Sequence, residues 1–148
     1  MLLCLGKGIK IEHVGSTAVP DLGGKNILDI VIGSSKNTQK IKERLERLGY
    51  ILVDDAGTPA RLFFYKDTIY RKKRIRMHLH LVKFNGRDWR EMVAFRNYLL
   101  CNKSAVKEYI KIKKQAVRLA HGNKEIYIKA KNRFIERVTQ KALRQLRL

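Results

Sequence analysis

The sequence contains little cysteine and little proline. Among its 148 residues there are two cysteines, Cys4 and Cys101, and two prolines. Two cysteines without Cys-x-x-Cys spacing are too few for a disulfide framework, so we expect reduced thiols packed as small apolar residues. Because 45% of the residues are hydrophobic, the chain also lacks the signature of disorder. Its length predicts a single domain over residues 1–148.

Long apolar stretches are absent as well. No run approaches the roughly 18 apolar residues that a membrane-spanning helix requires. The opening Met-Leu-Leu-Cys-Leu is too short for the apolar region of a signal peptide. We therefore expect a cytoplasmic protein without a membrane span.

Acidic residues are scarce: 33 Lys and Arg face 13 Asp and Glu, a net charge of +20. Up to Tyr70 there are 10 basic and 8 acidic residues, and from Arg71 onward 23 and 5, so the balance changes from +2 to +18. Such a field attracts polyanions, including RNA, nucleotide phosphates and anionic lipids. The alternative is that solvated helix faces carry lysine wherever any polar residue would serve.

The hydrophobic pattern predicts strands first and helices afterwards. The stretch 26–32 is apolar except for Asp29, which suits a strand buried on both faces. Gly49 is placed to end a helix, Ser104 to begin one and Gly122 to end one. We predict an α+β fold with a mixed sheet over about 8–84, flanked by helices, and a helical half over about 87–146. The predicted strands are 9–14, 26–32, 50–53, 61–66 and 75–82, with a turn at 85–86, and the predicted helices are 37–48, 87–101, 104–121 and 124–146.

A small-residue turn precedes the buried acid. Gly15-Ser16-Thr17 follows the first strand, and Asp29 lies on the next. Such a turn lets a phosphate approach backbone N–H groups and a hydroxyl, while an acid can hold the Mg²⁺ that bridges phosphates. A carboxylate inside an apolar strand is costly unless it is paired or ligating. Together these residues predict a phosphate site.

Several motifs resemble one protein family in order along the chain. Glu12-His13-Val14-Gly15-Ser16-Thr17-Ala18-Val19-Pro20, then Leu22, Lys25 and Ile27-Leu28-Asp29-Ile30, resemble the opening motif of the GrpB family. His78-Leu79-His80-Leu81 and Phe95-Arg96-Asn97-Tyr98-Leu99 resemble two later motifs. Tyr109 with Lys113, and Tyr127 with Lys131, Phe134 and Ile135, resemble two Tyr-x-x-x-Lys signatures. The likeness extends over roughly residues 12 to 142.

This resemblance implies a fold like that of the nucleotidyltransferase superfamily. In active members of that superfamily a Gly-Ser turn meets an Asp-x-Asp or Asp-x-Glu pair on the next strand. Here Val31 stands at the position of the second acid. Strand alternation points residues 29 and 31 to the same side, so Val31 faces the site but cannot bind metal. A two-metal clamp built from the Asp-x-Asp pair is lost.

Two histidines lie on one later strand. With period two, His78 and His80 face the same way, and we expect them beside Asp29 and near His13. These three histidines and Asp29 would make a transition-metal set. The alternative is that the histidines hydrogen-bond to the backbone or to Asp29 and hold the site without metal.

Tyr–Lys pairs recur on the predicted helices. Tyr109 with Lys113 and Tyr127 with Lys131 have i, i+4 spacing, which puts each pair on one helix face. An aromatic ring beside an ammonium can stack on a base while the lysine neutralises a phosphate. The alternative is ordinary helix surface with the tyrosines partly buried.

The leading hypothesis is therefore a nucleotide or phosphorylated ligand held between the turn, Asp29 and the basic helices. If the chain is an enzyme, we expect nucleotidyl transfer to an unknown acceptor. The assigned roles are Mg²⁺ binding for Asp29, phosphate binding for Gly15, Ser16 and Thr17, and charge neutralisation for Lys25, Arg96, Lys113 and Lys131.

Two alternatives remain open from the sequence. One is a non-catalytic module that binds RNA or a protein through its basic second half. The other is a truncated copy, because family members usually carry an extra helix before the motif, whereas 11 residues precede Glu12 here. Asp21 also stands where the family usually has Gly, and Asn26 where it often has Pro.

Overall fold

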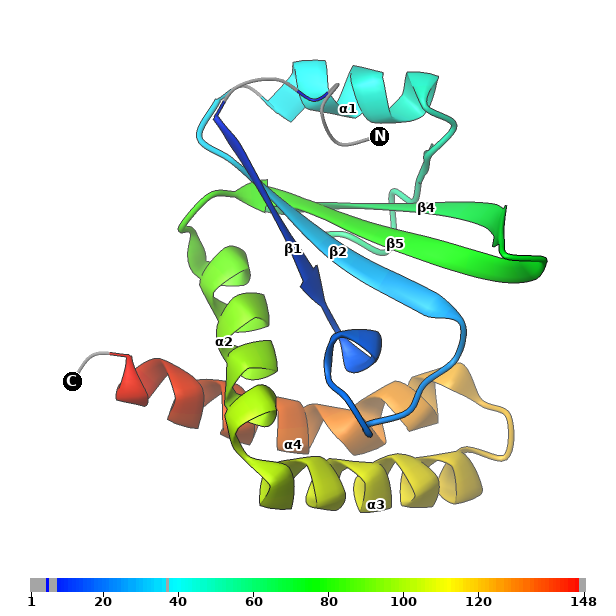
Figure 1. Cartoon of the computed structure of the whole chain (residues 1–148), viewed down its shortest axis with the longest axis vertical. Coiled ribbons are helices and arrows are strands. Elements are labelled where there is room, and N and C mark those ends of the chain that lie inside the picture. The colour runs from blue at the N-terminus through cyan, green and yellow to red at the C-terminus, as the bar shows by residue number, and fades with distance from the viewer. Residues whose placement is uncertain (1–4, 6–7, 37, 147–148) are drawn as a thin grey trace.

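A computed structural model of the chain describes residues 5, 8–36 and 38–146. The strands come first, with a short 3-10 helix and one α-helix among them, and helices alone follow (Figure 1). The elements in chain order are β1 (Ile9–Val14), the short 3-10 helix η2 (Ser16–Ala18), β2 (Ile27–Ser34), α1 (Thr38–Arg47), β3 (Ile51–Leu52), β4 (Arg61–Tyr70), β5 (Lys73–Lys83), α2 (Arg87–Cys101), α3 (Lys103–Ala120) and α4 (Lys124–Gln145).

The strands form one mixed sheet in the order β1-β2-β5-β4-β3. β2 pairs with β5 in parallel, whereas β1 with β2, β4 with β5 and β3 with β4 are antiparallel. The parallel pair brings Asp29 opposite His78 and Val31 opposite His80. The predicted α+β class and mixed sheet are confirmed.

The two faces of the sheet are covered differently. Alternation sends Ile30, Ile32 and Leu79 into a core closed by Ile41 and Leu45 of α1. The opposite face carries Asp29 and His78. α2 packs there, with Trp89 so near Gly33 that a Cβ on that glycine would lie 2.6 Å from the Trp89 ring.

A second core joins the β1–β2 loop to the helices. Val19 and Leu22 leave that loop and pack with Leu99, Tyr109 and Phe134 of α2, α3 and α4. The loop therefore lies alongside the α3–α4 pair (Figure 1). Burial of apolar side chains at about 25 cal/mol per Å² holds the loop there, and this packing places Ser16 next to α3.

Some element boundaries differ from the prediction. β3 covers two residues instead of four, and β4 runs on to Tyr70 instead of ending at residue 66. Ser104 lies inside α3, whose N-cap is Asn102, so the predicted cap is wrong. Cys101 is exposed, which contradicts its predicted packing as a core residue. Cys4 lies outside the described residues.

β4 is longer than predicted because its polar end is stabilised from β5. Asp67 accepts hydrogen bonds from Arg76 at 2.7 Å and from Arg74 at 3.0 Å. The turn that follows places Arg71 and Lys72 at φ 47° and 63°. Two consecutive positive φ angles characterise a type I′ hairpin turn, which usually carries Asn-Gly. The sequence offered no such signal.

No helix within the described ranges has both the length and the apolar character needed to cross a bilayer.

Candidate functional site

The chain passes directly over Asp29 at Gly15. This glycine has φ 73°, and a Cβ added there would lie 2.3 Å from Asp29 Oδ2 and 2.8 Å from Asp29 Cβ. A side chain at position 15 is therefore excluded twice, by the left-handed backbone and by the carboxylate. The small residue in the predicted motif is needed for this close approach.

Asp29 is paired with His78. The Nδ1 atom of His78 lies 3.1 Å from Asp29 Oδ1, and about a quarter of each side chain is exposed, 24% for His78 and 25% for Asp29. The edge of the Phe63 ring packs near His78, with 5.1 Å between ring centroids. Asp29 therefore has the partner that a carboxylate in an apolar strand requires, and one of its oxygens stands next to Gly15.

His80 lies farther along the same face and is buried. Its Nδ1 atom has no hydrogen-bond partner among the described residues, and its ring packs on Phe63. The pKa of His80 is lowered to about 4, mainly by burial and also by the charges of Arg61 and His78, while the Asp29 charge opposes this shift. The imidazole is neutral at pH 7, and it belongs to the interior beside the site.

His13 lies on the opposite face of the sheet from Asp29, so the prediction that His78 and His80 stand near His13 is wrong. Its register partner is Ile30, whose side chain points into the core under α1. Its Nε2 atom lies 3.0 Å from Thr17 Oγ1, and that hydroxyl donates to the carbonyl of Ile27 at 3.0 Å. Because the hydroxyl proton is used in the second bond, His13 Nε2 is the donor in the first.

The three histidines and Asp29 consequently do not form one cluster. Across the part of the chain that the structure describes, no group of three or more His, Cys, Asp or Glu is arranged to hold a metal ion. The Thr17 hydroxyl is likewise engaged in fixing the turn to β2. Because its proton is already donated to the Ile27 carbonyl, the hydroxyl has no proton left to donate to a ligand.

Val31 belongs to the protein core. It is fully buried and packs with Val14, Val82 and Trp89. α2 therefore covers the position where an active nucleotidyltransferase would carry its second acid. Its predicted orientation, on the same face as Asp29, agrees with the register.

Lys113 of α3 reaches the glycine turn. Its Nζ atom donates to Ser16 Oγ at 3.3 Å and to the carbonyl of Gly23 at 3.1 Å. The same ammonium lies 5.6 Å from the centroid of the Tyr109 ring. Burial lowers the pKa of Lys113. A helix far along the sequence thus places a partly desolvated cation against the predicted phosphate turn.

Lys131 of α4 approaches from the same side. Its Nζ atom lies 4.1 Å from the centroid of the Tyr127 ring. The pKa of Lys131 is lowered, first by burial and then by the charges of Lys113 and Lys25, while Asp29 raises it. Lys131 is therefore close enough to Lys113, Lys25 and Asp29 to sense their charges. Lys25 itself is exposed.

Tyr109 is not a stacking platform for a base. It is buried, and its ring lies face to face with Phe134 at 4.8 Å and an interplanar angle of 7°. Burial raises the pKa of Tyr109 to about 12, with smaller contributions from Tyr127 and Asp29. The ring therefore belongs to the helical core. Tyr127 is half-buried under Lys131.

Arg96 is used inside the fold. Its Nη1 atom donates to Glu12 Oε2 at 2.6 Å and to the carbonyl of His13 at 2.8 Å, and its side chain is 14% exposed. Its remaining donors reach Asn97. The guanidinium links α2 to β1 through these hydrogen bonds. It is therefore not free to neutralise the charge of a ligand.

Glu12 and the Gly23-Gly24 pair also shape the site, although the sequence pattern assigned them no role. Glu12 is an acid on the strand before the turn, in a chain rich in cations. Such an acid could have indicated an ion pair with an arginine inside the fold. Gly23 supplies a carbonyl to Lys113, and a Cβ at Gly24 would lie 3.4 Å from Ser16. Asp21, which stands where the resemblance leads us to expect Gly, has φ 66°, a conformation that glycine adopts more readily.

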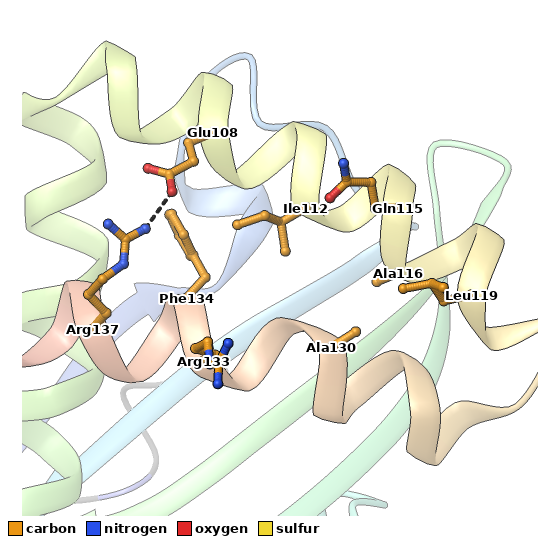
Figure 2. Close-up of a pocket in the computed structure, with 9 residues that line it drawn as sticks. All are labelled: Glu108, Ile112, Gln115, Ala116, Leu119, Ala130, Arg133, Phe134 and Arg137. Carbon is orange, nitrogen blue, oxygen red and sulfur yellow. Dashed lines mark hydrogen bonds and ion pairs between the residues drawn. The ribbon is translucent and has the colours of Figure 1, made fainter.

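A groove between α3 and α4 is separate from these residues. Its volume is about 260 Å³, and none of the predicted site residues lines it. Figure 2 shows apolar side chains of both helices along the groove, with the Arg137–Glu108 ion pair at one end. We place the candidate site at Asp29 because that is where the charged groups converge.

Comparison with known proteins decides the family. A family model described as GrpB protein matches residues 1–141. The chain belongs to the GrpB family. The resemblance found in the motifs is confirmed over nearly the whole chain.

Named GrpB relatives agree with this assignment. The chain is 30% identical over 138 residues to the glutamate-rich protein GrpB of Alkalihalophilus pseudofirmus, covering 90% of this chain and 79% of that protein. It is 28% identical to the UPF0157 protein YqkA of Bacillus subtilis, covering 92% of this chain but 39% of YqkA. The match to PA4798 of Pseudomonas aeruginosa covers 56% of that protein. The chain therefore spans only part of some longer relatives.

A solved structure shows the same GrpB fold. The crystal structure of the conserved protein GrpB from Enterococcus faecalis superimposes with a TM-score of 0.81 at 28% identity, covering 99% of this chain and 87% of that one. The α+β architecture, consistent with a nucleotidyltransferase-like fold, is thus shared within the family. The names of these proteins specify no ligand.

Proposed function

We propose that this GrpB-family chain binds a nucleotide, or another ligand with phosphate groups, between the Gly15-Ser16 turn, Asp29, Lys113 and Lys131. The observation that carries the proposal is the position of the Lys113 ammonium, 3.3 Å from Ser16 Oγ and 3.1 Å from the Gly23 carbonyl. A cation, a hydroxyl and a glycine-rich backbone in one place are the groups that hold phosphates.

The electrostatics support an anionic ligand. Neither Lys113 nor Lys131 has an ion pair with an acidic side chain among the described residues, and burial lowers the pKa of both. A desolvated ammonium without an acidic partner is destabilised in its charged form. A phosphate placed between these lysines would relieve that cost and would be bound strongly in return.

Mg²⁺ fits this site only together with the ligand. Asp29 would hold the ion, but one carboxylate is too few for a protein-built Mg²⁺ site, and its neighbour His78 offers an imidazole instead of an oxygen. Mg²⁺ is commonly bound by one or two carboxylates, waters and substrate phosphates. A bound ion would neutralise phosphate charge.

The GrpB site is better suited to binding than to two-metal nucleotidyl transfer. Val31 at the position of the second acid is fully buried under α2, so a second carboxylate-bound ion has no ligand there. Nucleotidyl transfer to an unknown acceptor is the more specific hypothesis. It is tested by pyrophosphate release from nucleoside triphosphates, which must disappear in Asp29→Asn if Asp29 acts in the reaction.

Isothermal titration calorimetry with each of the common nucleoside triphosphates, with and without Mg²⁺, tests the binding proposal. Lys113→Gln should weaken binding about tenfold or more, because it removes a charge-assisted contact. Lys114→Gln is the matched control, since Lys114 is the exposed neighbour on the same helix; it should change affinity less than about twofold. Asp29→Asn should weaken nucleotide binding only in the presence of Mg²⁺, so that the gain in affinity from Mg²⁺ becomes smaller. Equal effects of the two lysine variants, or no binding by any triphosphate, would overturn the proposal.

A further inference from the structure

The β4–β5 hairpin extends beyond the rest of the sheet. β5 pairs with β2 only from Arg76 onward, and β3 contacts β4 only at Phe64 and Tyr65. Residues 68–75, here termed the hairpin tip, therefore form a two-stranded ribbon without a third strand among the described residues (Figure 1). Both of its faces are open to solvent.

The hairpin tip is strongly basic. Its sequence Thr-Ile-Tyr-Arg-Lys-Lys-Arg-Ile contains four consecutive cations and no acid. Arg74 contacts Asp67, but Arg71, Lys72 and Lys73 have no ion pair in the described part of the chain. Unpaired cations on a protruding ribbon are well placed to contact a polyanion.

The two turn positions are occupied by residues that fit the backbone poorly. Arg71 and Lys72 both have positive φ, where Asn-Gly would be accommodated with less strain. Strain in a native structure is a reason to look for function at that position. Here the strained positions carry two of the four cations, at the point of the ribbon farthest from the core.

An aromatic ring stands among these charges. Tyr70 is 58% exposed, and the Arg71 guanidinium lies 5.3 Å from the centroid of its ring. Exposed rings beside cations bind single-stranded nucleic acid, because the ring stacks on an unpaired base and the cations contact phosphates. Base stacking on Tyr70 requires an unpaired strand.

Insertion into a membrane suits the hairpin tip less well. Ile69 and Tyr70 are both exposed, but consecutive strand residues point to opposite faces, so they do not form one apolar patch. The leading positions, Arg71 and Lys72, are charged. The tip therefore presents cations first, and Ile69 and Tyr70 expose apolar side chains on opposite faces.

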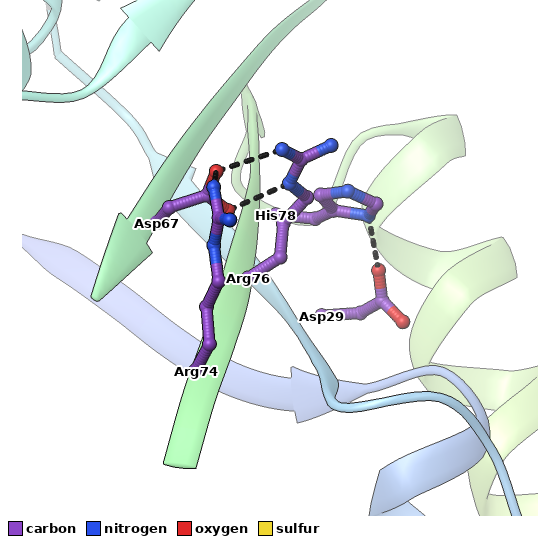
Figure 3. A network of polar contacts seen from close by, with 5 residues as sticks. All are labelled: Asp29, Asp67, Arg74, Arg76 and His78. Atoms are coloured by element: carbon purple, nitrogen blue, oxygen red, sulfur yellow. Dashed lines mark hydrogen bonds and ion pairs between the residues drawn. The ribbon is translucent and has the colours of Figure 1, made fainter. Parts of the chain in front are cut away.

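We propose that the hairpin tip binds single-stranded RNA. On one face of β5, Arg74, Arg76 and His78 follow one another toward Asp29 (Figure 3), so this RNA-binding surface lies beside the proposed nucleotide site. The two proposals rest on different residues. RNA binding by the tip requires neither Asp29 nor Lys113.

Fluorescence anisotropy with a labelled oligouridylate of about 12 nucleotides, at several KCl concentrations, tests this inference. Arg71→Asn/Lys72→Gly removes two cations while supplying the residues that the turn prefers, so the variant should fold at least as stably as the wild type. We expect its affinity to fall about tenfold and its salt slope to decrease by roughly 1.4, the value for two phosphate contacts on a single strand. Tyr70→Leu should weaken binding at least about fivefold with an unchanged salt slope.

Matched controls separate this idea from general charge attraction and from the nucleotide site. Lys107→Gln/Lys111→Gln removes two exposed cations from α3 and should leave RNA affinity within about twofold. Asp29→Asn should leave RNA affinity within about twofold, so failure of one proposal does not imply failure of the other. Equal losses in the α3 and hairpin variants would overturn the inference, as would wild-type affinity in Arg71→Asn/Lys72→Gly. The inference would also be overturned if the chain bound phosphatidylserine vesicles and Tyr70→Leu left its affinity for RNA unchanged.

Discussion

Gly15 illustrates at the residue scale how the absence of a side chain shapes this site. The backbone at Gly15 occupies the space directly over Asp29, and a Cβ there would lie 2.3 Å from Oδ2. The carboxylate can remain beside His78 only because the loop comes close without a side chain. The motif glycine is thus explained by contact as well as by conformation.

Gly15→Ala should therefore disrupt the site. The added methyl group meets Asp29, and φ 73° is unfavourable for alanine, so we expect a loss of about 2–3 kcal/mol in the free energy of unfolding. Urea denaturation measures it.

Gly23→Ala provides the matched control. Gly23 has φ 66°, but nothing lies within 4 Å of its Cβ position, so the substitution introduces backbone strain without a clash. We expect a loss of about 1 kcal/mol. If Gly15→Ala lowers the free energy of unfolding no more than Gly23→Ala does, the close contact with Asp29 does not restrict position 15.

His80 predicts a pH dependence of stability. Burial lowers its pKa from 6.5 to about 4 in the folded chain, so between these values the unfolded state binds more protons. The stabilisation is fully present above pH 6.5 and is lost as the pH falls toward 4. The full loss for this residue is on the order of 3 kcal/mol.

Urea denaturation at pH 7 and at pH 4.5, for the wild type and for His80→Leu, measures this contribution. The variant cannot titrate at position 80, so its free energy of unfolding should fall less between the two pH values. Identical pH dependence in both proteins would show that the buried imidazole takes up its proton without cost.

At the scale of elements, the site depends on α3 and α4 being held against the β1–β2 loop. α4 begins at an N-cap, Asn123, whose side chain accepts hydrogen bonds from the backbone N–H groups of Glu125 at 2.9 Å and Ile126 at 3.2 Å. The next turns of this helix carry Tyr127 and Lys131. The cap therefore fixes the start of the helix that brings one of the site cations.

Asn123→Ala should destabilise the chain by about 1 kcal/mol, since it leaves two N–H groups at the helix start without a partner. For a domain of this size the melting temperature should fall by roughly 2–4 °C, as circular dichroism would measure. Asn123→Asp retains an acceptor and should remain within about 0.5 kcal/mol of the wild type. A loss of the same size in Asn123→Asp would contradict the capping role.

Most of the elements themselves were predictable. Strands near β1, β2 and β5 and the helices α1 to α4 agree with hydrophobic periodicity, because that pattern is local. The end of β4 and the hairpin turn were missed. β4 continues past residue 66 because Asp67 is held by Arg74 and Arg76 across the hairpin, and such cross-strand pairing is not visible in the pattern of one strand.

On the scale of the whole molecule, the excess charge is the dominant property. A net charge of +20 on 148 residues places many like charges on one folded surface, and self-repulsion of this kind destabilises the compact state. GrpB of A. pseudofirmus is named for its glutamate, whereas here basic residues outnumber acidic ones by 33 to 13.

The melting temperature should consequently rise with salt. Screening becomes effective over about 10 Å at 0.1 M ionic strength, and we expect an increase of several degrees between low salt and roughly 0.3 M NaCl. Thermal denaturation followed by circular dichroism measures it.

Sodium sulfate at equal ionic strength separates screening from anion binding. A larger increase with sulfate that disappears in Lys113→Gln would indicate an occupied anion site. A melting temperature that is flat or falling with NaCl would contradict self-repulsion.

The sequence by itself determined the family, the α+β class and the need of Asp29 for a partner. They follow from different features of the chain. The family follows from motifs that resemble those of GrpB, and the fold class from the periodicity that selects strands and helices. The need of Asp29 for a partner follows from the cost of an acid in an apolar strand. The sequence also shows the small-residue turn directly, and it shows valine at position 31 in place of a second acid.

Only the tertiary structure decided which side chains meet. Strand register put His78 beside Asp29 and sent His13 to the opposite face. Helix packing placed Arg96 on Glu12, Tyr109 on Phe134 and Lys113 on Ser16. Such contacts join residues up to 97 positions apart, and they depend on how whole elements pack, which no local pattern in the chain specifies.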